Sequence, residues 1–363
     1  MGAESGFLIL NLQPTAYSLP KPSPRQQALF VAVRLSGGIM TRVGALSIFC
    51  ALFATGCAPG DEAEDIVYPT SADPTGCILE QITSEPYDEF QFSGASPDGL
   101  WLSYAFNMGE AENPTQGAYL LNLRSGERRV LPDPINNSGS FSADGRFLVG
   151  AQNIENGRTE IYEIDLETEE TKAIAAHQEW DYLPTYSLDG RHILFNSMRE
   201  GGQADIYLYE RAPETLERLT DYGGYDAHAQ FAPQGTRILF HRMNGPRQGG
   251  GYDFDLISLD LVTRQETRLT SGPFEESYGA WSPDGRHIVF SSDFEEAPEK
   301  HNLYIILSPD GEIVDKLTDG DWKDSYAYWT PDGSYIYFNS DRGGNTDIFR
   351  LPMNGLACKK AGK

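Results

Sequence analysis

Positive charge is scarce in this sequence. Its 363 residues include 28 lysines and arginines against 53 aspartates and glutamates, which gives a formal net charge of −25 with neutral histidines. A surface of this kind repels phosphate backbones, and the release of counterions cannot drive binding to them. We therefore expect no nucleic-acid partner.

Residues that support metal or nucleophilic chemistry are also few. No Gly-x-Ser-x-Gly sequence, which would mark the nucleophile of an α/β-hydrolase, occurs. No two histidines stand at an i, i+4 or His-x-His spacing that would indicate zinc; the six are His177, His192, His228, His241, His287 and His301. We predict no catalytic residue and no metal ligand, although histidines from separate repeats could still converge in space.

Long hydrophobic runs are absent as well. The mostly apolar stretch Val43 to Phe53 has eleven residues, about 16 Å as a helix and too short to span a bilayer. It follows Met40-Thr-Arg42 and precedes Ala54-Thr-Gly56, and this order is that of a secretory signal peptide. With Cys57 next, the segment resembles a bacterial lipoprotein signal, although that family usually has leucine at the position of the alanine.

The resemblance implies cleavage before Cys57 and lipidation of this residue, with an ordinary signal peptide without lipid as the alternative. Secretion machinery reads the extreme N-terminus, so we interpret residues 1–39 as an upstream translation artefact and 40–56 as the signal peptide. Residues 57–76 are rich in Asp, Glu, Pro and Ala and read as a disordered acidic tether. Alanine rather than aspartate at position 58 favours the outer membrane of a bacterial envelope, by analogy with that family.

A turn of the form Ser-Pro-Asp-Gly, or a close relative, occurs six times. The residues at its Asp position are Asp98, Asp144, Asp189, Gln234, Asp284 and Asp332, with spacings of 46, 45, 45, 50 and 48 residues. Each turn precedes a short β-branched and aromatic run. A period in this range, built only of short strands, indicates the blades of a β-propeller. We predict an all-β, six-bladed propeller over residues 77–358, followed by a tail at 359–363.

The last repeat ends one strand short, after Asp347-Ile-Phe-Arg-Leu351. The segment Ile78 to Ile82 resembles a stray fourth strand, so we predict that it completes blade six and closes the ring, which removes an open sheet edge. Cys77 precedes this strand and Cys358 follows its expected neighbour. In an exported compartment we predict a disulfide between them, with two free thiols as the alternative.

Acidic residues recur eight positions before the turn, where the innermost strand of a blade begins. Four of the six positions are acidic, namely Asp181, Asp226, Glu276 and Asp324. We predict that these carboxylates and His228 surround one mouth of the channel, where mutual repulsion would favour a divalent cation, a cationic ligand or a basic loop. The alternative is a structural role, in which the carboxylates accept hydrogen bonds from backbone amides of adjacent blades. Two residues further on, in the same strand phase, lie Leu183, His228, Tyr278 and Tyr326, which could add a stacking surface.

Two runs of the repeat carry a family resemblance. They are Trp281-Ser-Pro-Asp-Gly-Arg-His-Ile-Val-Phe290 and Trp329-Thr-Pro-Asp-Gly-Ser-Tyr-Ile-Tyr-Phe338, the second continuing to Phe349. They resemble the repeat of TolB-type propellers over about residues 78–356, with departures at Ala95 and Gln234. TolB is a periplasmic protein with an α/β domain ahead of its propeller, and it binds the peptidoglycan-associated lipoprotein. We expect no such domain here, so the resemblance implies the propeller superfamily rather than a role in the Tol–Pal system.

Two functions fit these observations. The favoured hypothesis is a non-enzymatic, monomeric, lipid-anchored propeller that binds a protein, peptide or glycan at the bacterial cell envelope through one loop face. It needs no cofactor, although a divalent cation could occupy the channel. The rival hypothesis is a propeller hydrolase or lyase that uses channel carboxylates and a bound metal. Fold alone does not separate the two hypotheses.

Overall fold

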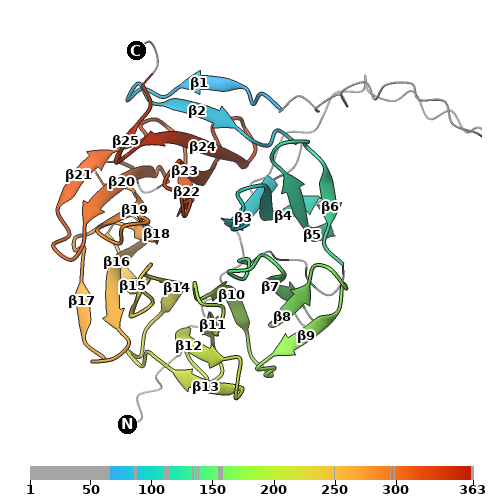
Figure 1. Ribbon diagram of the computed structural model, residues 1–363. Helices are drawn as coiled ribbons and strands as arrows, with labels where there is room; N and C mark the ends of the chain where they lie inside the picture. The colour runs from blue at the N-terminus through green and yellow to red at the C-terminus, as the bar shows by residue number, and fades with distance from the viewer. Residues whose placement is uncertain are drawn as a thin grey trace, which may run out of the picture. The chain divides into compact units, whose positions relative to one another are not determined.

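Short antiparallel strands make up the architecture of this protein. The structure is a computed structural model that describes residues 66–85, 88–108, 115–132, 135, 137, 139–153, 158–248, 250–294, 296–297 and 299–360. Within these ranges the chain forms 25 strands and no helix, and hence no helix that could cross a membrane. The strands build six sheets that stand radially around a central channel (Figure 1). The prediction of an all-β, six-bladed propeller is confirmed.

Blades one, three, four and five each contain four consecutive strands, ordered from the channel outward. Blade one is β3 (Asp88–Ala95), β4 (Trp101–Met108), β5 (Thr115–Asn122) and β6 (Arg128–Val130), and blade three is β10 (Asp181–Tyr186), β11 (His192–Ser197), β12 (Asp205–Glu210) and β13 (Thr215–Arg218). Blade four is β14 (Asp226–Phe231), β15 (Arg237–Pro246), β16 (Tyr252–Asp260) and β17 (Glu266–Arg268), and blade five is β18 (Glu276–Trp281), β19 (His287–Ser292), β20 (Asn302–Leu307) and β21 (Ile313–Lys316).

Blade two is the irregular member of the ring. It has three strands, β7 (Phe147–Asn153), β8 (Thr159–Asp165) and β9 (Thr171–Ile174), while isolated bridges stand in for the innermost strand. Gly150 occupies a position that is filled by a fully buried aromatic ring in every other blade; those rings are Tyr104, Phe195, Phe240, Phe290 and Phe338. A Cβ atom at Gly150 would lie 2.7 Å from the Asn137 carbonyl oxygen. The absence of a side chain at Gly150 therefore allows the irregular inner segment around Asn137 to lie close against β7.

The repeated turn owes its sequence to local hydrogen bonds. In blade three the Asp189 carboxylate accepts a hydrogen bond from the Ser187 hydroxyl (2.7 Å) and another from the Arg191 amide (3.1 Å). Gly190 has a φ of 67°, which costs glycine little and other residues more. The turns at Asp98, Asp144, Asp284 and Asp332 repeat the contact between the acid and a hydroxyl. The repeat seen in the sequence therefore reflects the same hydrogen-bonded turn in successive blades.

The N-terminal strand closes the ring, as predicted. Blade six contains β22 (Asp324–Trp329), β23 (Tyr335–Ser340) and β24 (Asp347–Asn354), and β2 (Ile78–Gln81) pairs antiparallel with β24. The structure adds two strands, β1 (Thr70–Ala72) outside β2 and β25 (Ala357–Cys358) beside β24. The prediction of disorder throughout 57–76 was therefore wrong at β1, because that segment finds a free sheet edge to pair with. Cys57 and the predicted signal peptide lie outside the described residues.

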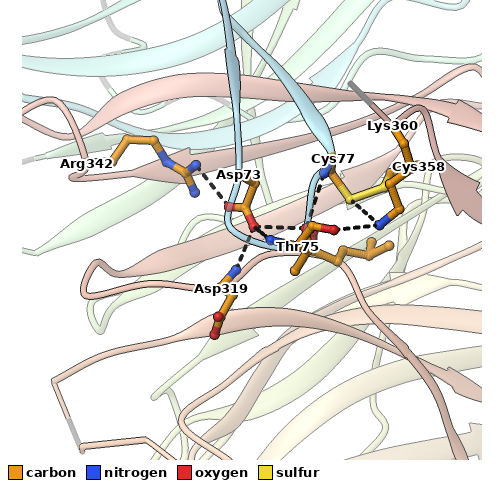
Figure 2. Close-up of a disulfide and its surroundings, with 8 residues drawn as sticks. Asp73, Thr75, Cys77, Asp319, Arg342, Cys358 and Lys360 are labelled. Carbon is orange, nitrogen blue, oxygen red and sulfur yellow. Dashed lines mark hydrogen bonds and ion pairs between the residues drawn. A yellow bond between two sulfur atoms is a disulfide. The ribbon is translucent and has the colours of Figure 1, made fainter. Parts of the chain in front are cut away.

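A disulfide joins Cys77 to Cys358, with sulfur atoms 1.95 Å apart and Cα atoms 5.6 Å apart. The turn between β1 and β2 is fixed beside this disulfide by Asp73, which is 4% exposed. Figure 2 shows the Asp73 carboxylate between Thr75, the Asp319 amide (3.0 Å) and the Arg342 guanidinium (3.3 Å). One buried carboxylate thus ties the N-terminal hairpin to the loops of blades five and six.

Candidate binding site in the central channel

Three of the predicted mouth carboxylates are buried ion pairs. Asp181, Asp226 and Asp324 begin the innermost strands of their blades and are 0% exposed. Their partners are arginines of the same blade: Arg199 lies 2.9 Å from Asp181, Arg242 binds both oxygens of Asp226 at 2.7 and 2.8 Å, and Arg342 binds both oxygens of Asp324 at 2.9 and 2.8 Å. The structure therefore does not form the open acidic mouth that the sequence suggested. It supports a structural role, with guanidinium groups in place of the backbone amides we considered.

Aromatic rings pack against the guanidinium groups of two of these ion pairs. The Arg342 guanidinium carbon lies 4.6 Å from the centre of the Trp322 ring, and that of Arg242 lies 4.3 Å from the Tyr222 ring. Burial raises the pKa of Asp324, and the nearby charge of Arg342 opposes the rise. Sequence reasoning missed these arginines. The signal was present in blades three and six, where an arginine follows the acid by 18 residues in each case.

Glu276 is the exception among the four acids. Phe294 stands 18 residues after it, where blades three and six have arginine. Glu276 is 5% exposed, and its Oε2 atom has no hydrogen-bond partner among the described residues. Burial, with further contributions from the negative charges of Asp255, Asp253 and Asp293, raises the pKa of Glu276 to about 7. Blade five therefore buries a carboxyl group without a matching cation.

This carboxyl group should make stability depend on pH. Because the pKa of Glu276 rises from 4.5 to about 7 on folding, the folded state holds the proton more tightly. Its contribution to stability is then full below pH 4.5 and is lost as the pH rises to about 7, a loss on the order of 3 kcal/mol. We expect Glu276→Gln to match the wild type in urea unfolding at pH 4.5 and to exceed it at pH 8. Exposed Glu312→Gln is the control, and an equal pH profile for Glu276→Gln and wild type would contradict the prediction.

Four equivalent side chains form what we call the channel ring: Leu183, His228, Tyr278 and Tyr326. Each sits at a β-bulge of an innermost strand, with φ values of 52°, 58°, 52° and 53°. Positive φ is uncommon outside glycine and costs about 1–3 kcal/mol per residue, and such strain concentrates at functional sites. The same conformation recurs at one position in four blades, and it makes the side chains displayed there the candidate site.

The three aromatic members of the channel ring form a stacking surface, as the shared strand phase suggested. The Tyr278 and Tyr326 rings stack with centroids 4.0 Å apart, and His228 lies roughly perpendicular to them at 5.2 and 5.6 Å. His241 of β15 extends the surface, parallel to His228 at 6.0 Å. A small cavity of about 30 Å³ lies beside Leu183, His228 and Tyr326, and we call this level of the channel its waist.

The channel ring carries no charge near neutral pH. Burial lowers the pKa of His228 to about 4 and that of His241 to about 3, so both imidazoles are neutral. Burial also raises the pKa of the Tyr278 hydroxyl well above its usual value. Neutral imidazole is the form that ligates metals, yet no group of three or more His, Cys, Asp or Glu side chains within the described ranges is arranged to hold an ion. The surface is built for stacking and hydrogen bonding.

Six radial sheets around a narrow channel define a six-bladed β-propeller. The family model described as the TolB beta propeller domain (PD40) matches residues 92–299 and 259–362. The chain belongs to this family. A comparison with curated proteins gives no match.

Solved structures show the same fold. TolB from Acinetobacter baumannii is 23% identical with a TM-score of 0.53, and the alignment covers 83% of this chain and 66% of that one, so this chain spans just under two thirds of its length. The putative TolB from Agrobacterium tumefaciens is 21% identical with a TM-score of 0.52, over 64% and 83% of the two chains. Oligogalacturonate lyase from Vibrio parahaemolyticus is 15% identical with a TM-score of 0.53, over 80% and 99%. At these identities the likeness concerns the fold.

Proposed function

We propose that this protein is a non-enzymatic binding scaffold of the bacterial cell envelope, which holds a protein, peptide or glycan against the channel ring. The observation that carries the proposal is the strained, uncharged surface of Leu183, His228, Tyr278 and Tyr326. Aromatic faces of this kind bind sugar rings and apolar or aromatic side chains, while phenol and imidazole groups supply hydrogen bonds. Three of the four buried acids, Asp181, Asp226 and Asp324, are paired with arginines and leave little free charge for chemistry.

Attachment to the envelope is part of the proposal. Cys57 would carry the lipid, and the segment between it and Ile66 would connect it to β1. The TolB likeness of the propeller supports an envelope location. The alternative, a hydrolase or lyase, draws support from the fold of the oligogalacturonate lyase and from the two neutral histidines. Elemental analysis separates the two: a stoichiometric transition metal that is lost in His228→Ala would favour the enzyme.

The channel ring can be removed without removing the fold. Glycine accepts positive φ without strain, so the double variant His228→Gly/Tyr326→Gly gains backbone relief while it loses ring contacts. We expect its free energy of unfolding to stay within about 1 kcal/mol of the wild type. We expect photo-crosslinking from position 183 in native envelopes to lose its specific adduct at least about tenfold.

The matched control is Val262→Gly, at an outer position that is 80% exposed. It should retain the adduct. An adduct that persists in the double variant, with the fold intact, would contradict a role for the channel ring in binding. An adduct lost equally in the control would show a loss of protein rather than of the site.

A further inference from the structure

A second cavity opens where the turns between the first and second strands of the blades meet. It has a volume of about 350 Å³, and residues from all six blades line it. Thr185, Gln230 and Tyr328 line both this cavity and the small one at the waist, so the two lie on the same axis. We call the larger one the turn-face cup. None of the sequence motifs we singled out for binding lies in it.

The rim of the turn-face cup is an apolar ring made by the repeat itself. The residue before the Asp position of each turn lines the cup in all six blades; these residues are Pro97, Ala143, Leu188, Pro233, Pro283 and Pro331. Leu188 is 58% exposed. Behind the rim stand aromatic residues that end the inner strands, such as Phe231 and Trp281. An exposed apolar ring with a concave centre is the form of a docking site.

The inner end of the turn-face cup, where it meets the smaller cavity, carries polar side chains. The Gln230 amide, which can both donate and accept a hydrogen bond, lies there with the Thr185 hydroxyl. With a volume of about 350 Å³, the cup suits a short projecting tip, whose backbone amides could pair with Gln230.

The negative charge around the rim favours basic residues on either side of that tip. The six four-residue turns contain five aspartates and no lysine or arginine. Hydrogen bonds from hydroxyl and backbone groups of the turns lower the pKa values of Asp144, Asp189, Asp284 and Asp332, so these carboxylates are ionised at neutral pH. Three arginines directly follow the turns, namely Arg146, Arg191 and Arg286. Arg146 is paired with Asp165 and Arg191 with Asp189. Five turn aspartates against these three arginines leave the turns with a net negative charge.

We propose that the turn-face cup is a second binding site, which receives an apolar loop tip of a partner protein flanked by lysine or arginine. The apolar rim takes the tip, the floor satisfies its backbone, and the carboxylates attract its basic flanks. This site is independent of the function proposed above, because none of the four channel-ring side chains lines the cup. A propeller with both sites could hold two partners at once.

Two fluorescein-labelled, head-to-tail cyclic hexapeptides test the proposal: one with Pro-Leu-Leu-Gly between two arginines, and the other with glutamates in place of the arginines. Fluorescence anisotropy with the purified protein should show binding of the arginine peptide, at least about tenfold tighter than that of the glutamate peptide at low salt. Added salt should weaken it. Leu188→Ser should weaken binding of the arginine peptide about tenfold, because it removes apolar surface from the rim without changing the charge of the rim.

Val262→Ser, a change from an apolar residue to serine at an exposed outer position, is the matched control and should bind as the wild type does. His228→Gly/Tyr326→Gly should also bind the arginine peptide normally, which separates failure of this site from failure of the channel ring. Equal affinity for the two peptides, no binding of either, or normal binding by Leu188→Ser would each overturn the proposal.

Discussion

Replacing Arg342 with alanine is expected to lower the free energy of unfolding by about 3–5 kcal/mol. The guanidinium group binds both oxygens of Asp324 and also reaches Asp73, and the side chains of both acids are 0% exposed. Its removal leaves two buried carboxylates without their cation and uncovers the Trp322 ring. Urea unfolding at pH 7.5, followed by tryptophan fluorescence, measures the loss. Arg342 thus joins the hairpin of β1 and β2, through Asp73, to the innermost strand β22, through Asp324.

The control for this variant is Lys172→Ala, which removes an ion pair whose side chains are 53% and 57% exposed. It should cost less than about 1 kcal/mol. The double variant Arg342→Ala/Asp324→Asn should recover part of the loss, because the second change removes a buried charge that has no partner. A loss below 1 kcal/mol for Arg342→Ala, or a double variant less stable than the single one, would contradict the assignment.

Removing the disulfide is expected to have an effect of similar size. Cys77 and Cys358 are separated by 281 positions, and chain entropy for a loop of that length gives an upper value of about 6 kcal/mol. The double variant Cys77→Ala/Cys358→Ala should therefore unfold at a clearly lower urea concentration than the wild type. The reason is the greater freedom of the unfolded chain, with the folded propeller nearly unchanged.

The wild type treated with reductant is the companion measurement, and its unfolding curve should coincide with that of the double alanine variant. Counting free thiols on unfolded, unreduced protein that lacks the leader should give none from these two positions. Reactive thiols at Cys77 and Cys358, or an unreduced wild type no more stable than the variant, would refute the bond.

The blade count and the closure could be predicted because they rest on local chemistry. The turn at Asp189 is specified by four consecutive residues, and the same four-residue pattern recurs along the chain. The pairing of β2 with β24 could be predicted because the last repeat lacks a fourth strand and the segment that begins at Ile78 belongs to no other repeat. The neighbours of Asp324 did not follow in this way, because Arg342 reaches it only once β22 and β23 are paired in register. The repeated spacing of 18 residues is visible in the sequence, but it can be read as an ion pair only once the pairing of those strands is known.

The turn-face cup could not be predicted from the sequence, for another reason. Each of its rim residues, such as Pro283 or Leu188, is fully explained as a turn residue within its own repeat. Their common property appears only when six turns meet around one axis, as the radial arrangement in Figure 1 brings about. Strand β1 escaped prediction because three polar or small residues, Thr70–Ala72, carry no strand pattern until an edge is offered to them.

The position of the disulfide also decides how the protein bears a mechanical load. A pull on the chain ahead of Ile66 would first break the hydrogen bonds of Ile66 and Tyr68 to the backbone of blade one. It would then strip β1 from β2, which is an outer pair of three residues each. At Cys77 the tension would pass into a covalent bond and reach the opposite end of the polypeptide at Cys358. The hydrogen bonds between β2 and β24 would then be spared the force. A propeller tethered by its N-terminus could in this way sway with a moving membrane without opening.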